Sequence, residues 1–430
     1  MINTDYYKGK NITIAGLARS GLACCNLLRA LGADVSVTDN CDTQITRTNA
    51  KSLVSKKIKV ELGKHTREFI KGRDFLVISP GVADNALPVI WAQDQGIPVI
   101  SEIEVAASLC PATIIAVTGS NGKTTVTTLI GRILEEAGRK VFVCGNIGKP
   151  FSQEVEKMGS EDFVSLEVSS FQLERIIGFK PKISVMLNFS ANHLDRYDNI
   201  REYLVAKKRV FINQDNTDYL VINRDDPVLR ELSKEADAKV VYFSSTAEFN
   251  PNQAAVLAVG SLLGVDKQTV LGVFDGFQGI EHRMEKVSRI NDIIFINDSK
   301  STTVESAIWA LENISDPIIW IAGGKHKGVD YNSVLDSAKG KVKEVILIGE
   351  AAGILEDVFR GNLSIERANT LEEAVSKAYH KASAGDCILL SPMCSSFDMF
   401  LNYEERGRQF KQAVSGLGQA QARDDAKSKV

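Results

Sequence analysis

The residues with the clearest chemistry lie in one glycine-rich segment, Thr118-Gly119-Ser120-Asn121-Gly122-Lys123-Thr124-Thr125. Backbone N–H groups in such a loop can point at phosphate oxygens, and a helix that starts there adds partial positive charge. Lys123 would neutralise the β- and γ-phosphates of ATP, and the Thr124 hydroxyl would hold Mg²⁺. Val117 stands where the usual P-loop has its first glycine. We nevertheless favour a nucleotide site, with contacts from Gly119, Ser120, Asn121, Gly122, Lys123, Thr124 and Thr125.

Two further residues could complete a metal site. Glu167 ends an apolar segment that predicts a strand, and ligands of open α/β sheets gather at the carboxyl ends of strands. For an isolated glutamate at a strand end, a simple solvated side chain would be the favoured interpretation. His193 follows another predicted strand, but Mg²⁺ prefers oxygen ligands, and a single histidine in a loop is commonly an ordinary residue.

The N-terminal segment Gly16-Leu17-Ala18-Arg19-Ser20-Gly21 is similar to a dinucleotide-binding turn, with Ala18 in place of the second glycine. Asp39 ends the next predicted strand, where an acid could bond a ribose or a base. A plain tight turn fits these residues equally well. If a ligand binds here, it is nucleotide-like: a nicotinamide cofactor or a uridine diphosphate group.

Short β-branched strands alternate with amphipathic stretches along the whole chain, which is typical of parallel, doubly wound sheets. We predict an α/β protein of three domains, each an α/β sheet unit. The N-terminal unit is Rossmann-like, the central unit a P-loop-type ATPase and the C-terminal unit Rossmann-like. The expected limits are 1–110, 111–278 and 279–415, followed by a flexible tail at 416–430.

Composition excludes several classes of protein. The 430 residues carry 51 Lys plus Arg against 54 Asp plus Glu, a net charge of -3 that argues against a broad nucleic-acid surface. No stretch is apolar for long enough to span a bilayer, and the N-terminus lacks the apolar core of a signal peptide. Seven cysteines without a CxxC pair favour reduced thiols over disulfides or a zinc cluster. We expect a cytoplasmic monomer with neither nucleic acid nor membrane as a partner.

Further sequence segments, taken together with the phosphate loop, indicate a family. The segments Leu166–Leu173, Asn192–Tyr197 and Ala206–Arg209, together with that loop, resemble the Mur ligases of bacterial cell-wall synthesis. Residues 297–302 and 390–407 look like those of the members that add D-glutamate. The resemblance covers essentially the whole chain except the tail.

The resemblance implies an ATP-dependent amide synthesis. ATP would phosphorylate the terminal carboxylate of UDP-N-acetylmuramoyl-L-alanine, and the amine of D-glutamate would attack the acyl phosphate. Thr124 and Glu167 would serve one Mg²⁺, and His193 a second. Lys207 matches a family lysine that CO₂ carbamylates, which would convert a cation into an anion able to help hold that second ion.

Other positions carry roles by the same resemblance. The expected catalytic residues are Lys123, His193, Lys207 and Lys300, and further ATP contacts are expected at Asn223, Arg283 and Asp298. The predicted substrate contacts are Gly16, Asp39, Ser79, Gly81, Asn146, Ser169, Lys327, Ser396, Phe397 and Tyr403. A cation at Lys327 suits a dicarboxylate such as D-glutamate. By residue type alone, Phe397 and Tyr403 could equally pack in a core.

Four alternatives remain open at this point. A folylpolyglutamate synthase would share the last two domains but lacks a nucleotide-sugar domain before Pro111. Sister Mur ligases add L-alanine, a diamino acid or a dipeptide, although the Asp-Asn-Pro-Arg segment expected for a diamino acid does not occur in the sequence. A nicotinamide-dependent oxidoreductase would leave the second phosphate loop unexplained. A regulatory module would bind ATP without consuming it.

Overall fold

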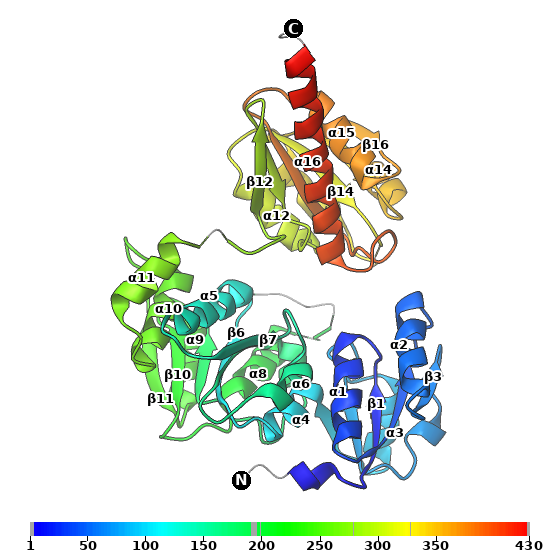
Figure 1. The fold of residues 1–430 in the computed structure, drawn as a ribbon, viewed down its shortest axis with the longest axis vertical. Helices are drawn as coiled ribbons and strands as arrows, with labels where there is room; N and C mark the ends of the chain where they lie inside the picture. Colours follow the sequence, from blue (N-terminus) through cyan, green and yellow to red (C-terminus); the bar gives the residue numbers. More distant parts are fainter. Residues whose placement is uncertain (1–3, 191–195, 198, 278, 327, 428–430) are drawn as a thin grey trace. The chain divides into compact units, whose positions relative to one another are not determined.

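The computed structural model describes residues 4–190, 196–197, 199–277, 279–326 and 328–427, with side chains as far as Leu417. Three β-sheets with helices around them confirm the predicted α/β fold of three sheet units. The chain divides into two compact units, Met1–Phe277 with two of the sheets and Gln278–Val430 with the third. Figure 1 shows the elements of each unit. The predicted domain limits stay predictions.

The first sheet is parallel, with strand order β3-β2-β1-β4-β5. The order reverses at β1, between β2 and β4, and such a switch point leaves a crevice at the carboxyl ends of the strands. The elements are β1 (Asn11–Ala15), α1 (Arg19–Ala30), β2 (Asp34–Asp39), α2 (Gln44–Val54), β3 (Lys59–Leu62), β4 (Phe75–Ile78), α3 (Leu87–Asp94), β5 (Val99–Ser101) and α4 (Glu102–Ser108).

The second sheet is also parallel, with order β11-β10-β9-β6-β8-β7, and its switch point lies at β6. Its strands are β6 (Thr113–Thr118), β7 (Val141–Gly145), β8 (Phe163–Glu167), β9 (Ile183–Met186), β10 (Tyr219–Asn223) and β11 (Lys239–Phe243). Its helices are α5 (Lys123–Glu136), α6 (Phe151–Glu154), α7 (Ser170–Leu173), α8 (Ile200–Lys208), α9 (Pro227–Leu232), α10 (Pro251–Leu262) and α11 (Lys267–Asp275).

The first two sheets share one hydrophobic core, in which α1 and α4 meet α6. Polar contacts reinforce this junction. The Glu104 carboxylate accepts hydrogen bonds from three consecutive backbone N–H groups, those of Ile177 at 2.9 Å, Gly178 at 2.7 Å and Phe179 at 3.0 Å. The Arg196 guanidinium donates to the carbonyls of Pro80 and Val82. The crevice of the first sheet is therefore held in place beside the second sheet.

The third sheet has order β12-β13-β17-β14-β15-β16, in which the edge strand β12 is antiparallel and the others parallel. Its strands are β12 (Glu285–Ile290), β13 (Ile293–Asn297), β14 (Ile318–Gly323), β15 (Val342–Ile348), β16 (Ile365–Arg367) and β17 (Cys387–Met393). Its helices are α12 (Val304–Glu312), α13 (Leu335–Ala338), α14 (Ala352–Phe359), α15 (Leu371–Lys381) and α16 (Tyr403–Lys427).

The long helix α16 packs beside α15 (Figure 1). It includes the predicted boundary at residue 416, so residues 416–427 of the expected tail belong to a helix. Short 3-10 helices occur at Thr4–Tyr7, Arg67–Phe69, Val155–Lys157, Arg209–Phe211, Ser233–Glu235 and Asn332–Val334. Among the helices that the structure describes, none is long and apolar enough to cross a membrane.

Glu104 gives a test of the junction between the first two sheets. Glu104→Ala leaves three N–H groups without their shared carboxylate, so we expect the free energy of unfolding of the first unit to fall by about 1–3 kcal/mol. Urea unfolding followed by circular dichroism measures this change. Glu136→Ala, at an exposed position at the end of α5, is the control and should change stability by less than about 0.5 kcal/mol. Equal urea midpoints for the two variants would contradict the role of Glu104.

Candidate functional site

The loop between β6 and α5 has the backbone shape that a phosphate cradle needs. Gly122 precedes the first residue of α5 with a φ of 81°, in the left-handed region that favours glycine. Gly119 has a φ of 153°. A Cβ atom at Gly122 would also lie 2.3 Å from the side-chain oxygen of Asn252. The two glycines therefore allow β6 to run straight into α5 with the helix N-terminus at the edge of the sheet.

Two lysine side chains converge on this loop. Lys123 Nζ donates to the carbonyls of Gly119 at 2.8 Å and Ser120 at 2.9 Å. Lys207 Nζ, from α8, donates to the same Gly119 carbonyl at 2.8 Å. Lys207 is 1% exposed, and burial first, then the charge of Lys123, lower its pKa well below the usual 10.5, while Glu167 opposes this shift. Two amines that share one carbonyl oxygen create a site that favours an anion.

Glu167 lies next to this loop with one oxygen unsatisfied. It ends β8 and pairs in register with Val117 of β6, just before the loop. It is 2% exposed, and its Oε1 accepts a hydrogen bond of 2.9 Å from the Asn146 side chain. Its Oε2 is buried and has no hydrogen-bond partner among the described residues. Buried carboxylate oxygens are normally satisfied, so this atom fits a cation ligand or an ordered water.

The described part of the chain offers only some of the predicted metal ligands. Thr124 is the second residue of α5 and is buried. His193 lies outside the described residues, and its role stays a prediction. The described residues contain no group of three His, Cys, Asp or Glu side chains that could hold a metal ion together. Thr124 and Glu167 nevertheless fit Mg²⁺, because this ion usually takes few protein ligands and fills its other positions with water and phosphate oxygens.

A neighbouring segment holds the tip of the loop, which the sequence reasoning did not identify. Ser120 N donates to the Asn188 carbonyl at 3.1 Å, and Asn121 N donates to the Asn188 side chain at 2.9 Å. Asn223 donates to the carbonyl of Leu187 at 3.0 Å. Three of the predicted ATP contacts thus have partners within the protein, and the two bonds to Asn188 hold the loop itself. In the sequence, the one feature that could have pointed to Asn188 is its position directly after a predicted strand.

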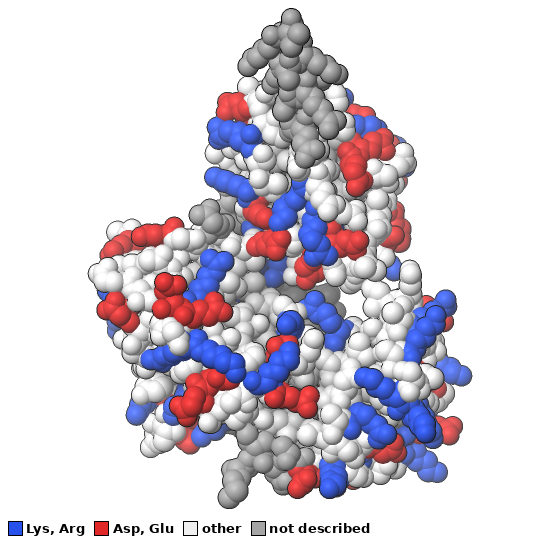
Figure 2. Space-filling view, viewed as in Figure 1, with Lys and Arg blue, Asp and Glu red and all other residues white. Residues whose placement is uncertain are grey.

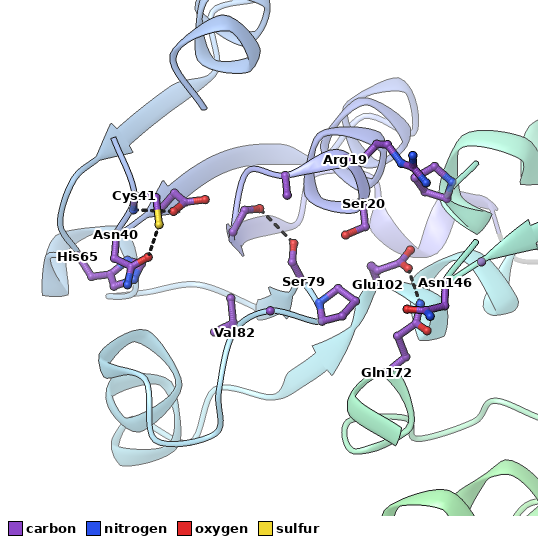
Figure 3. A pocket seen from close by; sticks show the side chains of 17 residues that line it. Arg19, Ser20, Asn40, Cys41, His65, Ser79, Val82, Glu102, Asn146 and Gln172 are labelled. Atoms are coloured by element: carbon purple, nitrogen blue, oxygen red, sulfur yellow. Dashed lines mark hydrogen bonds between the residues drawn. The ribbon is translucent and has the colours of Figure 1, made fainter. Parts of the chain in front are cut away.

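A cavity of about 400 Å³ lies at the switch point of the first sheet (Figure 3). Its wall includes five predicted substrate contacts, Gly16, Asp39, Ser79, Gly81 and Asn146. The two oxygens of Asp39 accept backbone N–H groups, from Leu17 at 2.6 Å and from Cys41 at 2.7 Å. Ser79 Oγ donates to the Gly16 carbonyl at 3.1 Å. Since Asn146 also bonds Glu167, the cavity extends to the side chains beside the phosphate loop.

A relay of polar side chains lines the end of the cavity near the second sheet. Ser169 caps α7, and its backbone N–H donates to the Gln172 side chain at 3.0 Å. Gln172 then donates to Glu102 at 3.2 Å. Burial raises the pKa of Glu102 to about 7, although its bond from Gln172 opposes this. Gln172 and Glu102 line the cavity, whereas Ser169 positions Gln172; neither Gln172 nor Glu102 was predicted.

In the second unit, the predicted residues lie on loops at the carboxyl ends of the central strands. Asp298 and Lys300 follow β13, and Ser396 and Phe397 follow β17. Burial raises the pKa of Asp298 to about 6, and its oxygens accept bonds from Ser391 Oγ and the Met284 N–H. Lys327 lies outside the described residues.

The two aromatic residues of this unit have different surroundings. Phe397 is 60% exposed, so the alternative that it packs in a core is wrong. Tyr403 begins α16, and its carbonyl accepts a bond of 2.8 Å from Ser299 Oγ. The ammonium of Lys300 lies 5.8 Å from the centre of the Tyr403 ring, within the range of a cation–π contact.

A buried arginine, not predicted from the sequence, connects these loops. Arg406 is fully buried and donates to Ser299 Oγ at 3.0 Å, to the Ser299 carbonyl at 2.8 Å and to the Cys394 carbonyl at 3.1 Å. Burial lowers its pKa to about 10. Because Ser299 lies between Asp298 and Lys300, and Cys394 lies two residues before Ser396, one side chain fixes both predicted binding loops.

Comparison with known proteins covers all three sheets. The Mur ligase MurD-like, N-terminal domain matches residues 10–101, the Mur ligase middle domain matches 117–265, and the Mur ligase, glutamate ligase domain matches 282–394. The UDP-N-acetylmuramoylalanine--D-glutamate ligase of Thermoanaerobacter sp. (strain X514) is 39% identical over 449 residues, covering 95% of this chain and 99% of that protein. The chain belongs to the Mur ligase family. The predicted resemblance is therefore confirmed.

Two further Mur ligases support this. The UDP-N-acetylmuramoylalanine--D-glutamate ligase of Geotalea uraniireducens (strain Rf4) is 40% identical over 442 residues, with 95% of this chain and 98% of that protein covered. The solved structure of UDP-N-acetylmuramate-alanine ligase MurC from Thermotoga maritima matches with a TM-score of 0.60 and 17% identity, covering 95% of this chain and 99% of that one. At 17% identity, the similarity to the MurC structure shows only that the two chains share a fold.

Cys41 offers a chemical probe of the cavity in this Mur ligase. It lines the cavity and is exposed, whereas burial raises the pKa of Cys25 and Cys387 to about 12 and that of Cys110 to about 11. Since the thiolate is the reactive form, we expect iodoacetamide near neutral pH to alkylate Cys41 at least about tenfold faster than the other cysteines. Peptide mass spectrometry measures the rates, and Cys41→Ser should remove the fast phase. Early labelling of Cys25 would contradict the exposure pattern.

Proposed function

We propose that this Mur ligase family member uses ATP and Mg²⁺ to join D-glutamate to UDP-N-acetylmuramoyl-L-alanine, as a monomer in the cytoplasm. The observation that carries the proposal is the convergence of Lys123 and Lys207 on the Gly119 carbonyl beside the unsatisfied oxygen of Glu167. The names of the two D-glutamate ligases that match nearly the whole chain support the choice of amino acid.

The proposal assigns contacts to three ligands. ATP would contact Gly119, Ser120, Asn121, Gly122, Lys123, Thr124, Thr125, Asn223, Arg283 and Asp298. The nucleotide-sugar peptide would contact Gly16, Asp39, Ser79, Gly81, Asn146 and Ser169, and D-glutamate would contact Lys327, Ser396, Phe397 and Tyr403. Thr124, Glu167, His193 and Lys207 would serve the metal ions, and Lys123, His193, Lys207 and Lys300 the chemical steps.

The chemistry must bring two anions together. A carboxylate oxygen of the substrate attacks the γ-phosphorus of ATP and ADP leaves, and the amine of D-glutamate then attacks the acyl carbon and phosphate leaves. Lys123 and the start of α5 would offset the repulsion between the carboxylate and the triphosphate. Mg²⁺, when bound, would offset the charge of the β- and γ-phosphates. Asn146 would hold Glu167 in a fixed direction through its 2.9 Å hydrogen bond.

The low pKa of Lys207 supports its proposed carbamylation. Only a neutral amine can attack CO₂, and the burial of Lys207 favours that form. The new N–C bond forms from the amine lone pair, and the lost proton leaves a carbamate with one negative charge. The result would be an oxygen ligand on α8, directed at the loop that Lys207 already contacts.

An amino-acid panel tests the reaction. With ATP, Mg²⁺ and UDP-N-acetylmuramoyl-L-alanine present, we expect phosphate release with D-glutamate, and less than a hundredth of that rate with L-alanine, L-glutamate or a diamino acid. Lys123→Ala should lower the rate at least about 100-fold, because it removes the cation beside the transferring phosphoryl group, while the circular dichroism spectrum stays unchanged. Phosphate release without an amino acid, or preference for another one, would refute the proposal.

Glu167 tests the metal part separately. In the wild type, Mg²⁺ added to a non-hydrolysable ATP analogue should raise the melting temperature beyond the effect of the analogue alone, since a ligand that binds the folded state stabilises it. Glu167→Gln keeps the side-chain volume but removes the anionic oxygen, so the Mg²⁺ increment should disappear. Glu161→Gln, an exposed site before β8, is the matched control and should keep the increment. An unchanged increment in Glu167→Gln would exclude Glu167 as a ligand.

A further inference from the structure

His65 lies on the wall of the first cavity, and its surroundings determine which ring nitrogen carries the proton. The loop after β3 places the ring beside the hydroxyl of Thr38, with 2.7 Å between Nδ1 and Oγ1. The same hydroxyl lies 3.0 Å from an oxygen of Glu61 and 3.3 Å from the carbonyl of Lys64. His65 was not among the residues that the sequence singled out.

The hydroxyl of Thr38 has one proton and three neighbours. The Glu61 carboxylate and the Lys64 carbonyl can only accept hydrogen bonds, so the hydroxyl proton goes to one of these oxygens. The lone pairs of Oγ1 are then left for His65, and Nδ1 must be the donor. In the neutral ring, Nδ1 carries the proton and Nε2 is an acceptor. Burial lowers the pKa of His65 although Asp39 and Glu61 oppose this, which favours the neutral ring.

The position of His65 in the cavity indicates which ligand groups could donate a hydrogen bond to Nε2. His65, Asn40 and Cys41 lie together at one end of the cavity (Figure 3). Both oxygens of Asp39, the predicted contact for a base, already accept one backbone N–H each. No hydrogen bond from a described residue reaches Nε2 of His65. The ring therefore offers an uncommitted acceptor at this end of the cavity.

We infer that Nε2 of His65 accepts the imide N3–H of a uracil base and so determines the choice of pyrimidine. The inference rests on the proposed function, because it needs a uridine nucleotide in this cavity. In cytosine, N3 is an acceptor, so two lone pairs would face each other. A binding site that accepts a hydrogen bond from the ligand discriminates strongly against an analogue without that donor. With the analogue bound, the acceptor of the protein is left without a hydrogen-bond partner.

Calorimetric binding of UDP, CDP and N3-methyl-UDP to the full-length chain tests the inference. The wild type should bind UDP at least about 10-fold more tightly than CDP or N3-methyl-UDP. His65→Phe removes the acceptor from an aromatic ring, so the UDP-to-CDP ratio of affinities should fall at least about 5-fold. Thr38→Val removes the hydroxyl that fixes the proton on Nδ1 and should lower the same ratio with His65 still present. Arg19→Gln, at the cavity wall away from His65 in Figure 3, is the control and should keep the ratio.

The outcomes separate this inference from the proposed function. If the wild type binds UDP but binds N3-methyl-UDP equally well, or if His65→Phe keeps the full discrimination, the role of His65 is refuted and the ligase remains. If the wild type binds no uridine nucleotide, the proposed function itself fails. If His65→Phe does not fold, the comparison of the three nucleotides on the wild type and on Thr38→Val still decides the question.

Discussion

The Gly119 carbonyl oxygen receives hydrogen bonds from two lysine side chains, and the phosphate loop depends on that arrangement. A second buried ammonium group beside Lys123 would be repelled with little screening by water, so burial and the charge of Lys123 lower the pKa of Lys207 well below its usual value. The first residue of α5, Lys123, and the α8 residue Lys207 are held against this one loop by the helices that carry them. The same constraint explains why a buried carboxylate, Glu167, ends the neighbouring strand. An anion with bound cations would complete a charge pattern that the protein alone leaves unbalanced.

The architecture brings the phosphate loop close to the cavity of the first sheet. Both sheets of the first unit reverse their strand order at the strand that leads into a glycine turn, β1 in one and β6 in the other. The shared core and the bonds of Glu104 keep these two switch points together. Asn146 lines the cavity of one sheet and bonds Glu167 of the other. Figure 2 shows both basic and acidic side chains on the viewed surface of each unit.

The fold and the phosphate loop could be predicted because their signals are local. Apolar strands at the centre of each sheet form continuous runs, and the glycine turn directly precedes its helix. The strands β3, β11, β12 and β16 were not predicted; each lies at the edge of its sheet and mixes polar with apolar residues. Contacts between residues far apart in the chain could not be predicted from the sequence either. Examples are the hydrogen bonds between Lys207 and Gly119, 88 positions apart, and between Arg406 and Ser299, 107 positions apart. The position of Glu167 at the end of a predicted strand singled it out, whereas Lys207 came from family resemblance alone, and the geometry of both needed the structure.

The buried Arg406 has a consequence for how such an enzyme can change. Its guanidinium joins the segment around Ser299 to the segment around Cys394, so the two segments cannot shift independently. If the two segments bind nucleotide and the incoming amino acid as proposed, a descendant that accepted a different amino acid would need to reshape the second segment without moving the first. Evolution toward new substrates is therefore easier through side chains that line these segments than through insertions or deletions in their backbones.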